Sequence, residues 1–279
     1  MSIKIENTQV FGWEAAIRGA RNPMNSWDKS DSWFVDYWDT LDEYYGVHTI
    51  FGRHAEMQDT NEKTVGGSQL MDVSWFDKDG NPYKITVPWN DKLDSEVILG
   101  FSDHKLLMNL CKGGTEESKW RRMVHVSMDI TAPLYWWKEF ETYKVGTVSN
   151  SCSTMHKIHA KEFTLDDFSC EHLFIDNTEH RGDFRIINNK QWLMFTCDLL
   201  NNMRDAFLKT KDKKYWWQLI QLLPSSYNQR RTIDLNYEVL ASQYRQRKEH
   251  KLDEWRQYCD WIKTLPYSEF ITMEENECD

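Results

Sequence analysis

A lysine, a cysteine and a histidine lie close together in one polar part of this sequence and could do chemistry on a small anionic ligand. Lys144 precedes a run of mostly small polar residues, Thr147–Thr154, which contains Cys152, and His156 follows it. The thiolate is the reactive form of cysteine, and a nearby cation such as Lys144 or His156 favours that form. Cys152 is therefore a candidate nucleophile, with a buried and inert cysteine as the alternative.

Asn236 and Arg247 form a second candidate pair. They are eleven residues apart, and helical residues advance by about 100° each, so eleven residues make close to three turns. We expect both side chains on one face of a helix, where they could bind a ligand or instead cap and pair within the protein. Near the N-terminus, Arg18 and Arg21 could hold a phosphate, but a solvated helix end is the simpler interpretation.

The elements that must position these residues begin with a strand. Residues Met123–Ile130 alternate between apolar and polar, which is typical of a half-buried strand. Ala132-Pro133 ends the ladder because proline has no N–H donor, and proline suits the first turn of a helix. We expect that helix over Leu134–Lys144, ended by Gly146, with a loop at Thr147–Thr154.

The remaining pattern predicts a mixture of strands and helices. In the first half we predict an edge strand at Ser2–Phe11, a β-hairpin of Met71–Phe76 and Tyr83–Val87, and helices at Trp13–Ala20, Asp28–Tyr45 and Asp103–Gly114. The last of these helices ends in a glycine C-cap. In the second half we predict a helical segment at Trp192–Leu223 with a polar break at Lys209–Lys214, and a last helix at Tyr258–Phe270 with a stop at Leu265-Pro266.

Composition excludes several classes of protein. The chain has 279 residues and a net charge of −10, which argues against binding a nucleic-acid duplex because that needs a positive field. No apolar run approaches the ~20 residues that cross a bilayer, so no membrane partner is expected. The six cysteines contain no CxxC pair, which indicates reduced thiols and a cytoplasmic protein. With their neighbouring histidines they match no standard zinc spacing.

Two regions of the chain resemble the flavin-dependent (ThyX-type) thymidylate synthases. In that family the helix end and loop carry the pattern R-H-R-x-x-S-x-N-E-x-S-x-R. Aligned without gaps from Pro133, the pattern falls on Thr142, Tyr143 and Lys144, and then on Thr147, Ser149, Asn150, Cys152 and Thr154. The second region has Leu223-Pro224, Asn236 twelve residues after the proline, and Arg247. Together the two regions cover residues 103–155 and 218–270.

The resemblance implies an α/β (α+β) fold in which helices pack around a small antiparallel sheet. We expect residues 1–279 to form a single ThyX-like domain with an insertion at about 46–98, which carries the predicted hairpin. Family members assemble as homotetramers with pockets built from several subunits. A homo-oligomer, with a tetramer as the family's form, is therefore expected.

The resemblance also implies a chemistry and a set of site residues. ThyX-type enzymes methylate dUMP at C5, taking one carbon from methylenetetrahydrofolate and a hydride from NADPH through FAD. The implied substrate-binding residues are Arg247, Lys144, Tyr143, Glu139 and Asn150, and the implied cofactor-binding residues are Asn236 and Thr142. Cys152 replaces a serine of the nucleotide pocket, from where a thiolate could attack C6 of a pyrimidine and activate C5. Lys144 is the only cation at the three R-H-R positions. Other flavin-side positions fall on Glu238 and Ser242, so FAD is a possible but doubtful cofactor.

Three functions remain open at this point. The first is a divergent ThyX-like enzyme that transfers a one-carbon unit to C5 of dUMP or a related pyrimidine nucleotide. The second is a catalytically inactive protein that binds or sequesters such a nucleotide. The third is a structural or interaction protein that keeps only the fold, because a fold does not fix a function.

Overall fold

The computed structural model describes residues 3–36, 48–50, 53–56, 64–65, 68–76, 82–89, 95–175, 180–181, 184–185 and 188–273. The α-helices are α1 (Trp13–Arg21), α2 (Phe101–Gly113), α3 (Leu134–Phe140), α4 (Asn189–Thr210), α5 (Lys213–Leu222), α6 (Tyr237–Arg247), α7 (Asp253–Ile262) and α8 (Glu269–Thr272). Within these residues the 3-10 helices are η1 (Asn22–Met24), η2 (Trp27–Lys29), η3 (Glu117–Met123) and η4 (Leu165–Asp167).

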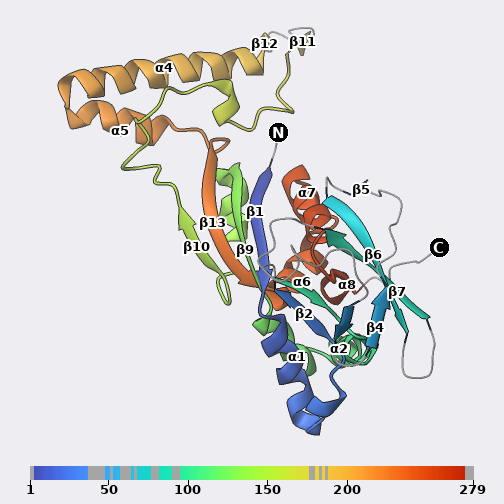
Figure 1. Cartoon of the computed structure of the whole chain (residues 1–279). Coiled ribbons are helices and arrows are strands. Elements are labelled where there is room, and N and C mark those ends of the chain that lie inside the picture. Colours follow the sequence, from blue (N-terminus) through green and yellow to red (C-terminus); the bar gives the residue numbers. More distant parts are fainter. Residues whose placement is uncertain are drawn as a thin grey trace. The chain divides into compact units, whose positions relative to one another are not determined.

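The strands form one central sheet and several smaller ones. The central sheet has the order β1-β9-β13-β10 and consists of β1 (Lys4–Phe11), β9 (His125–Pro133), β13 (Asn228–Asn236) and β10 (Val148–Ser151) (Figure 1). Elsewhere lie β2 (Trp33–Asp36), β3 (His48–Ile50), β4 (Arg53–Glu56), β5 (Thr64–Val65), β6 (Ser68–Phe76), β7 (Pro82–Trp89), β8 (Ser95–Ile98), β11 (His180–Arg181) and β12 (Phe184–Arg185).

The two inner strands of the central sheet, β9 and β13, are antiparallel. At one end the amide of Tyr237 donates to the carbonyl of Val124 (3.0 Å), and at the other the amide of Leu134 donates to the carbonyl of Tyr227 (3.0 Å). Every second residue of β9 is buried, so the predicted alternation of Met123–Ile130 is confirmed. The apolar residues of β9 therefore face the core, and its polar residues share the opposite side.

The segment after β9 differs from the prediction in two places. Helix α3 begins at Leu134, directly after Pro133, as predicted, but it ends at Phe140 rather than Lys144. The carbonyl of Glu139 accepts from both the amide (3.1 Å) and the hydroxyl (2.7 Å) of Thr142, which closes a turn instead of continuing the helix. The predicted loop also contains strand β10, whose residues are all exposed. An exposed edge strand has no apolar alternation, so its sequence resembles a loop.

The chain divides into two compact units. Unit 1 contains residues 1–6, 128–144 and 149–233, and unit 2 contains residues 7–127, 145–148 and 234–279. In unit 1 the α4–α5 pair packs on a cluster of buried residues, namely Ile158, Phe163, Phe168, Leu193, Cys197, Leu200 and Leu219. In unit 2 aromatic rings interlock: Trp13 meets Tyr237 and Tyr267 edge-on at 5.3 Å, and Trp120 meets Phe270 at 5.2 Å. Much of the tryptophan surplus thus serves packing.

Most other helices agree with the sequence pattern. The predicted helical segment Trp192–Leu223 consists of α4 and α5, which lie side by side (Figure 1). Its predicted break is confirmed at Lys211 and Asp212, and the Asp212 side chain caps α5 by accepting from the Lys214 amide (3.0 Å). The helix at Asp103–Gly114 is confirmed as α2, with Gly114 as its C-cap at φ 114°. The last predicted helix is wrong in its bounds, because α7 begins at Asp253 and ends at Ile262. The predicted stop at Leu265-Pro266 lies between α7 and the turn-like α8.

The N-terminal third contains one wrong helix and one confirmed hairpin. The strand at Ser2–Phe11 is confirmed as the edge strand β1, and the helix at Trp13–Ala20 as α1. The helix over Asp28–Tyr45 is wrong, because Trp33–Asp36 form strand β2, paired with β8; residues 37–45 lie outside the described residues. The predicted hairpin is confirmed by the antiparallel register of β6 and β7, from Gln69 opposite Trp89 to Phe76 opposite Pro82.

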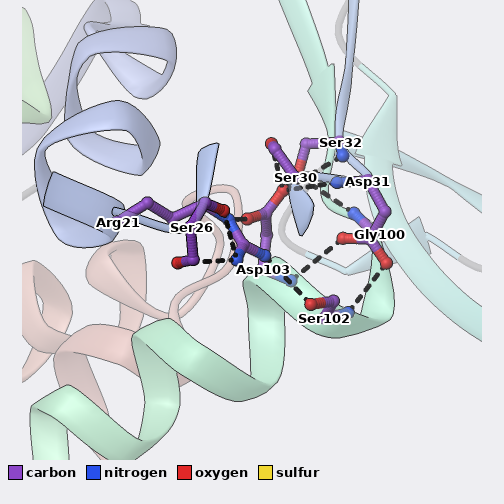
Figure 2. A network of polar contacts seen from close by, with 8 residues as sticks. All are labelled: Arg21, Ser26, Ser30, Asp31, Ser32, Gly100, Ser102 and Asp103. Atoms are coloured by element: carbon purple, nitrogen blue, oxygen red, sulfur yellow. Dashed lines mark hydrogen bonds and ion pairs between the residues drawn. The ribbon is translucent and has the colours of Figure 1, made fainter. Parts of the chain in front are cut away.

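A buried ion pair fastens the start of unit 2 to α2 (Figure 2). Arg21 is only 3% exposed, and its Nε donates to Oδ1 of Asp103 at 2.6 Å. The other oxygen of Asp103 accepts from the hydroxyls of Ser30 (2.7 Å) and Ser32 (2.7 Å). Arg21 is therefore neither a phosphate ligand nor a solvated helix end. Its role is structural, because its positive charge is balanced by the buried carboxylate of Asp103.

Candidate functional site

Most of the predicted nucleotide contacts lie on the surface of unit 1, at the end of α3 and along β10. Thr142 and Lys144 are exposed, while Glu139 and Tyr143 are half-buried. Gly146 joins the turn to β10 at φ +75°, where a Cβ atom would lie 3.1 Å from Nδ2 of Asn236. That backbone conformation favours glycine, so Gly146 has a definite role, although it does not end the helix. Asn150 is exposed within β10.

Cys152 follows β10 directly and combines a fixed main chain with an exposed side chain. Its amide donates to the carbonyl of Arg230 (2.9 Å), and its own carbonyl accepts from Nε2 of Gln229 (2.7 Å). Its side chain is exposed, so the alternative of a buried cysteine is wrong.

Three other cysteines provide a contrast. Cys111, Cys197 and Cys259 are buried. Burial raises the pKa of Cys111 and Cys197 to about 11 and that of Cys259 to about 12. These three thiols are therefore inert near neutral pH, and Cys152 is the better candidate nucleophile.

Asn236 and Arg247 bracket helix α6 in unit 2. Asn236 is the last residue of β13 and the N-cap of α6, and its Oδ1 accepts from the amide of Val239 (3.1 Å). Arg247 is the last residue of α6, and its guanidinium lies 4.8 Å from the ring centroid of Trp255. The prediction of a shared helix face is wrong for Asn236, because this residue precedes the helix and belongs to a strand that the sequence pattern did not reveal.

The predicted residues are thus divided between the two units. Unit 1 holds Glu139, Thr142, Tyr143, Lys144, Asn150 and Cys152, and unit 2 holds Asn236 and Arg247. Within unit 1 the structure connects the α3 turn to Cys152 through two residues that sequence reasoning missed, Gln229 and Arg231. No signal marked them, because the run Asn228-Gln-Arg-Arg231 was not recognised as part of a strand.

The flavin-side residues do not fit the diphosphate of FAD. The Thr142 hydroxyl donates to the Glu139 carbonyl, and the buried Asn236 caps α6. Glu238, at another matched position, forms an ion pair with the buried Arg121 (2.9 Å). A diphosphate needs cationic or N–H donors. Glu238 is acidic, the Thr142 hydroxyl already donates within the protein, and only Asn236 carries N–H donors, so the three side chains supply no positive charge.

The described residues were compared with two kinds of feature, a metal site and a membrane-spanning helix, and contain neither. They contain no group of three or more histidine, cysteine, aspartate or glutamate side chains arranged to hold a metal ion. Among these same residues, no helix has both the length and the apolar character needed to cross a membrane.

Comparison with known proteins places the fold. No protein-family model matches the sequence, and no curated protein matches it. Solved structures do match the chain, and two of them match over nearly the whole length of both chains. The flavin-dependent thymidylate synthase ThyX from Helicobacter pylori, complexed with FAD and dUMP, matches with a TM-score of 0.53 and 11% identity over 97% of this chain and 96% of that chain.

A second structure of Helicobacter pylori ThyX with FAD and dUMP matches with a TM-score of 0.52 and 11% identity, over 97% of this chain and 95% of that one. The agreement covers both regions that carried the sequence resemblance and the segments between and around them. The sequence prediction of the fold is confirmed: this chain has an α/β fold of the ThyX type, built around a small antiparallel sheet.

Proposed function

We propose that this chain is a divergent ThyX-like enzyme that transfers a one-carbon unit to C5 of dUMP or a related pyrimidine nucleotide, with Cys152 as the nucleophile. The observation that carries the proposal is the exposed thiol of Cys152, held by main-chain bonds on both sides, at a position that the resemblance matches to a nucleotide pocket. The ThyX-like fold supports it, since the two similar structures are of a thymidylate synthase bound to dUMP.

The chemistry follows from the electron demand of the pyrimidine ring. Addition of the Cys152 thiolate to C6 moves the electron pair of the C5–C6 double bond toward C5, which then attacks the one-carbon donor, methylenetetrahydrofolate. Loss of the C5 proton and expulsion of the thiolate restore the double bond. The attack by C5 breaks one of the two C–N bonds of the donor's methylene carbon. Conversion to a methyl group needs a hydride, which replaces the second C–N bond and releases tetrahydrofolate; the family takes this hydride from NADPH. Because the FAD positions fit poorly, no step is assigned to a flavin here.

The remaining predicted residues would bind the substrate. In unit 1, Lys144 would hold the phosphate as a cation, and Tyr143 and Asn150 would supply hydrogen bonds to the sugar or base. Arg247, in unit 2, keeps the nucleotide-binding role that the resemblance implies for it. Glu139, when ionised, accepts hydrogen bonds only, so it would favour a base edge that presents N–H donors. Binding of dCMP and dUMP should be compared for this reason.

A nucleotide-binding protein without catalysis is the second candidate. It is favoured by the poor fit of Thr142, Asn236 and Glu238 to FAD, because a binder needs no hydride donor. Thermal-shift measurements with dUMP, dCMP and dTMP, combined with the visible absorbance of the purified protein, separate the candidates. Both candidates require a nucleotide to raise the melting temperature; yellow flavin absorbance would favour the flavoenzyme, and no shift with any nucleotide would leave only a structural role.

We further propose a cytoplasmic homo-oligomer, with the tetramer as the first expectation. Trp192, Phe195 and Leu199 on α4 are 63%, 55% and 44% exposed, and their spacing of three and four residues places them on one helix face. Phe174 and Ile175 are exposed beside the start of α4. Together these side chains expose on the order of 500 Å², a large part of the ~800 Å² that each partner contributes to a stable interface. A second copy of the chain is the proposed occupant.

A further inference from the structure

A relay of polar contacts in unit 1 joins the two segments that carry the predicted site residues. Nε2 of Gln229 donates to the carbonyl of Cys152 (2.7 Å), and Oε1 of Gln229 accepts from Nε of Arg231 (3.0 Å). Nη1 of Arg231 then donates to Oε1 of Glu141 (2.8 Å). Glu141 caps the end of α3 and stands three residues before Lys144. The relay therefore runs from the nucleophile's main chain to the turn with the predicted cation.

A tryptophan holds the middle of this relay in place. The guanidinium of Arg231 lies 4.4 Å from the ring centroid of Trp137, and Nε1 of Trp137 donates to the carbonyl of Gln229 (3.0 Å). Trp137 and Gln229 are buried, and the Arg231 side chain is only 12% exposed. Bonds shielded from water resist breaking more than surface bonds do, which applies to the part of the relay around Gln229 and Trp137. The Arg231–Glu141 bond is charge-assisted, but it lies at the surface, because the Glu141 side chain is 55% exposed.

We infer that Arg231 and Gln229 are positioning residues, which fix the end of β10 that carries Cys152 against the turn that carries Thr142 to Lys144. Neither residue is assigned a contact with the nucleotide, because each acts through the main chain of Cys152 or the side chain of Glu141. Any effect on catalysis rests on the proposed function. The positioning itself is a property of unit 1 and can be tested without a substrate.

Three substitutions test the individual bonds of the relay, and a fourth is a control. Gln229→Leu removes the bond to Cys152 and the acceptor of Arg231. Arg231→Met removes the cation and both of its bonds. Arg231→Lys keeps a cation for Glu141, but a lysine ammonium lacks the planar fork that reaches Gln229 and Glu141 together, so it should be intermediate. Arg204→Met is the matched control: Arg204 is 15% exposed, pairs with Asp205 (2.8 Å) and donates to the His159 carbonyl (3.1 Å).

Hydrogen–deuterium exchange read by mass spectrometry, followed by alkylation of Cys152 with iodoacetamide, tests the inference. In Gln229→Leu and Arg231→Met, the rate of hydrogen–deuterium exchange across residues 148–154 should rise roughly tenfold, because local opening of this segment costs less free energy. The rate of Cys152 alkylation should change with it. Arg231→Lys should show a smaller change, and Arg204→Met none in this segment. Exchange across 148–154 that is the same in Gln229→Leu, Arg231→Lys and Arg204→Met would overturn the inference.

The same variants keep the inference separate from the proposed function. If exchange responds as expected while neither dUMP nor dCMP stabilises the wild-type protein, the relay stands and the proposed function fails. If dUMP stabilises the wild type while exchange does not respond, the relay is rejected and the proposed function stands. Where both hold, Arg231→Lys should recover part of the nucleotide-dependent stabilisation that Arg231→Met loses.

Discussion

In unit 2 the buried carboxylate of Asp103 balances the charge of the buried Arg21. Burial alone would raise the pKa of Asp103, but hydrogen bonds from Ser32, Ser30 and Arg21 outweigh burial and lower the pKa below its ordinary value. The ionised carboxylate is therefore the form that the folded state prefers. A protein that keeps Arg21 buried depends on that carboxylate to balance the charge.

Asp103→Asn should accordingly lower the free energy of unfolding by about 3–5 kcal/mol, because it leaves the buried Arg21 guanidinium without the carboxylate that it pairs with directly. Urea denaturation near neutral pH measures the change. Since the folded pKa is depressed, the stabilisation is fully present above the unfolded pKa of about 4 and is lost as pH falls through the folded pKa. The difference between wild type and Asp103→Asn should therefore shrink in acid, and a difference independent of pH would contradict this assignment.

The exposure of Cys152 and the burial of three other cysteines predict the order in which the thiols react. Iodoacetamide near neutral pH should modify Cys152 well before Cys111, Cys197 and Cys259, because burial keeps those three protonated and covered. Peptide mass spectrometry after brief labelling of the native protein gives the order. Labelling of Cys259 before Cys152 would show that the exposed position of Cys152 is wrong.

At the scale of elements, α6 depends on its cap. Asn236→Ala removes the side-chain acceptor of the Val239 amide and should cost about 1 kcal/mol of unfolding free energy. Asn236→Ser keeps a capping oxygen and should cost less, as measured by thermal or urea unfolding. If both variants bind a nucleotide as the wild type does, Asn236 is only a cap; a binding loss in Asn236→Ser beyond its stability loss would give it a ligand role as well.

The elements also show how far a sequence can predict this fold. Strand β9, α2 and the β6–β7 hairpin were predictable because their apolar periodicity or glycine signals are local. Strand β10 was not, because all of its residues are exposed and its partner, β13, lies far along the chain. The helix assigned near Trp33 failed because the spacing of aromatic residues fits a helix, while the partner strand β8 decides the structure.

The candidate site was predictable only in part, for a related reason. The alignment to the ThyX pattern predicts that Cys152 lies at a pocket position, and the structure adds that Cys152 is exposed. Gln229 and Arg231 could not be found in this way, because their contacts join positions that are 77 and 90 residues apart in sequence. Pairing across a sheet, rather than any local motif, brings them to Cys152 and Glu141.

At the scale of the whole molecule, the ThyX-like fold covers nearly the full chain, while the single-domain organisation and the assembly stay predictions. Phe195→Glu places a charge in the exposed face of α4 and should shift the protein toward smaller species in light scattering coupled to size exclusion. Met194→Glu is the matched control: Met194 is 50% exposed, but it lies about 200° around the helix from Trp192. If the two variants form species of the same size, the interface does not lie on this face of α4.

The most direct test of the account is the release of tritium from dUMP labelled at C5, because loss of the C5 hydrogen is the step that one-carbon transfer at this carbon requires. The account predicts that wild-type protein with methylenetetrahydrofolate releases tritium to water and that Cys152→Ser, though folded and still stabilised by dUMP, does not. Undiminished release by Cys152→Ser would remove the nucleophile. No release by the wild-type protein from labelled dUMP or dCMP would contradict the proposed enzyme itself.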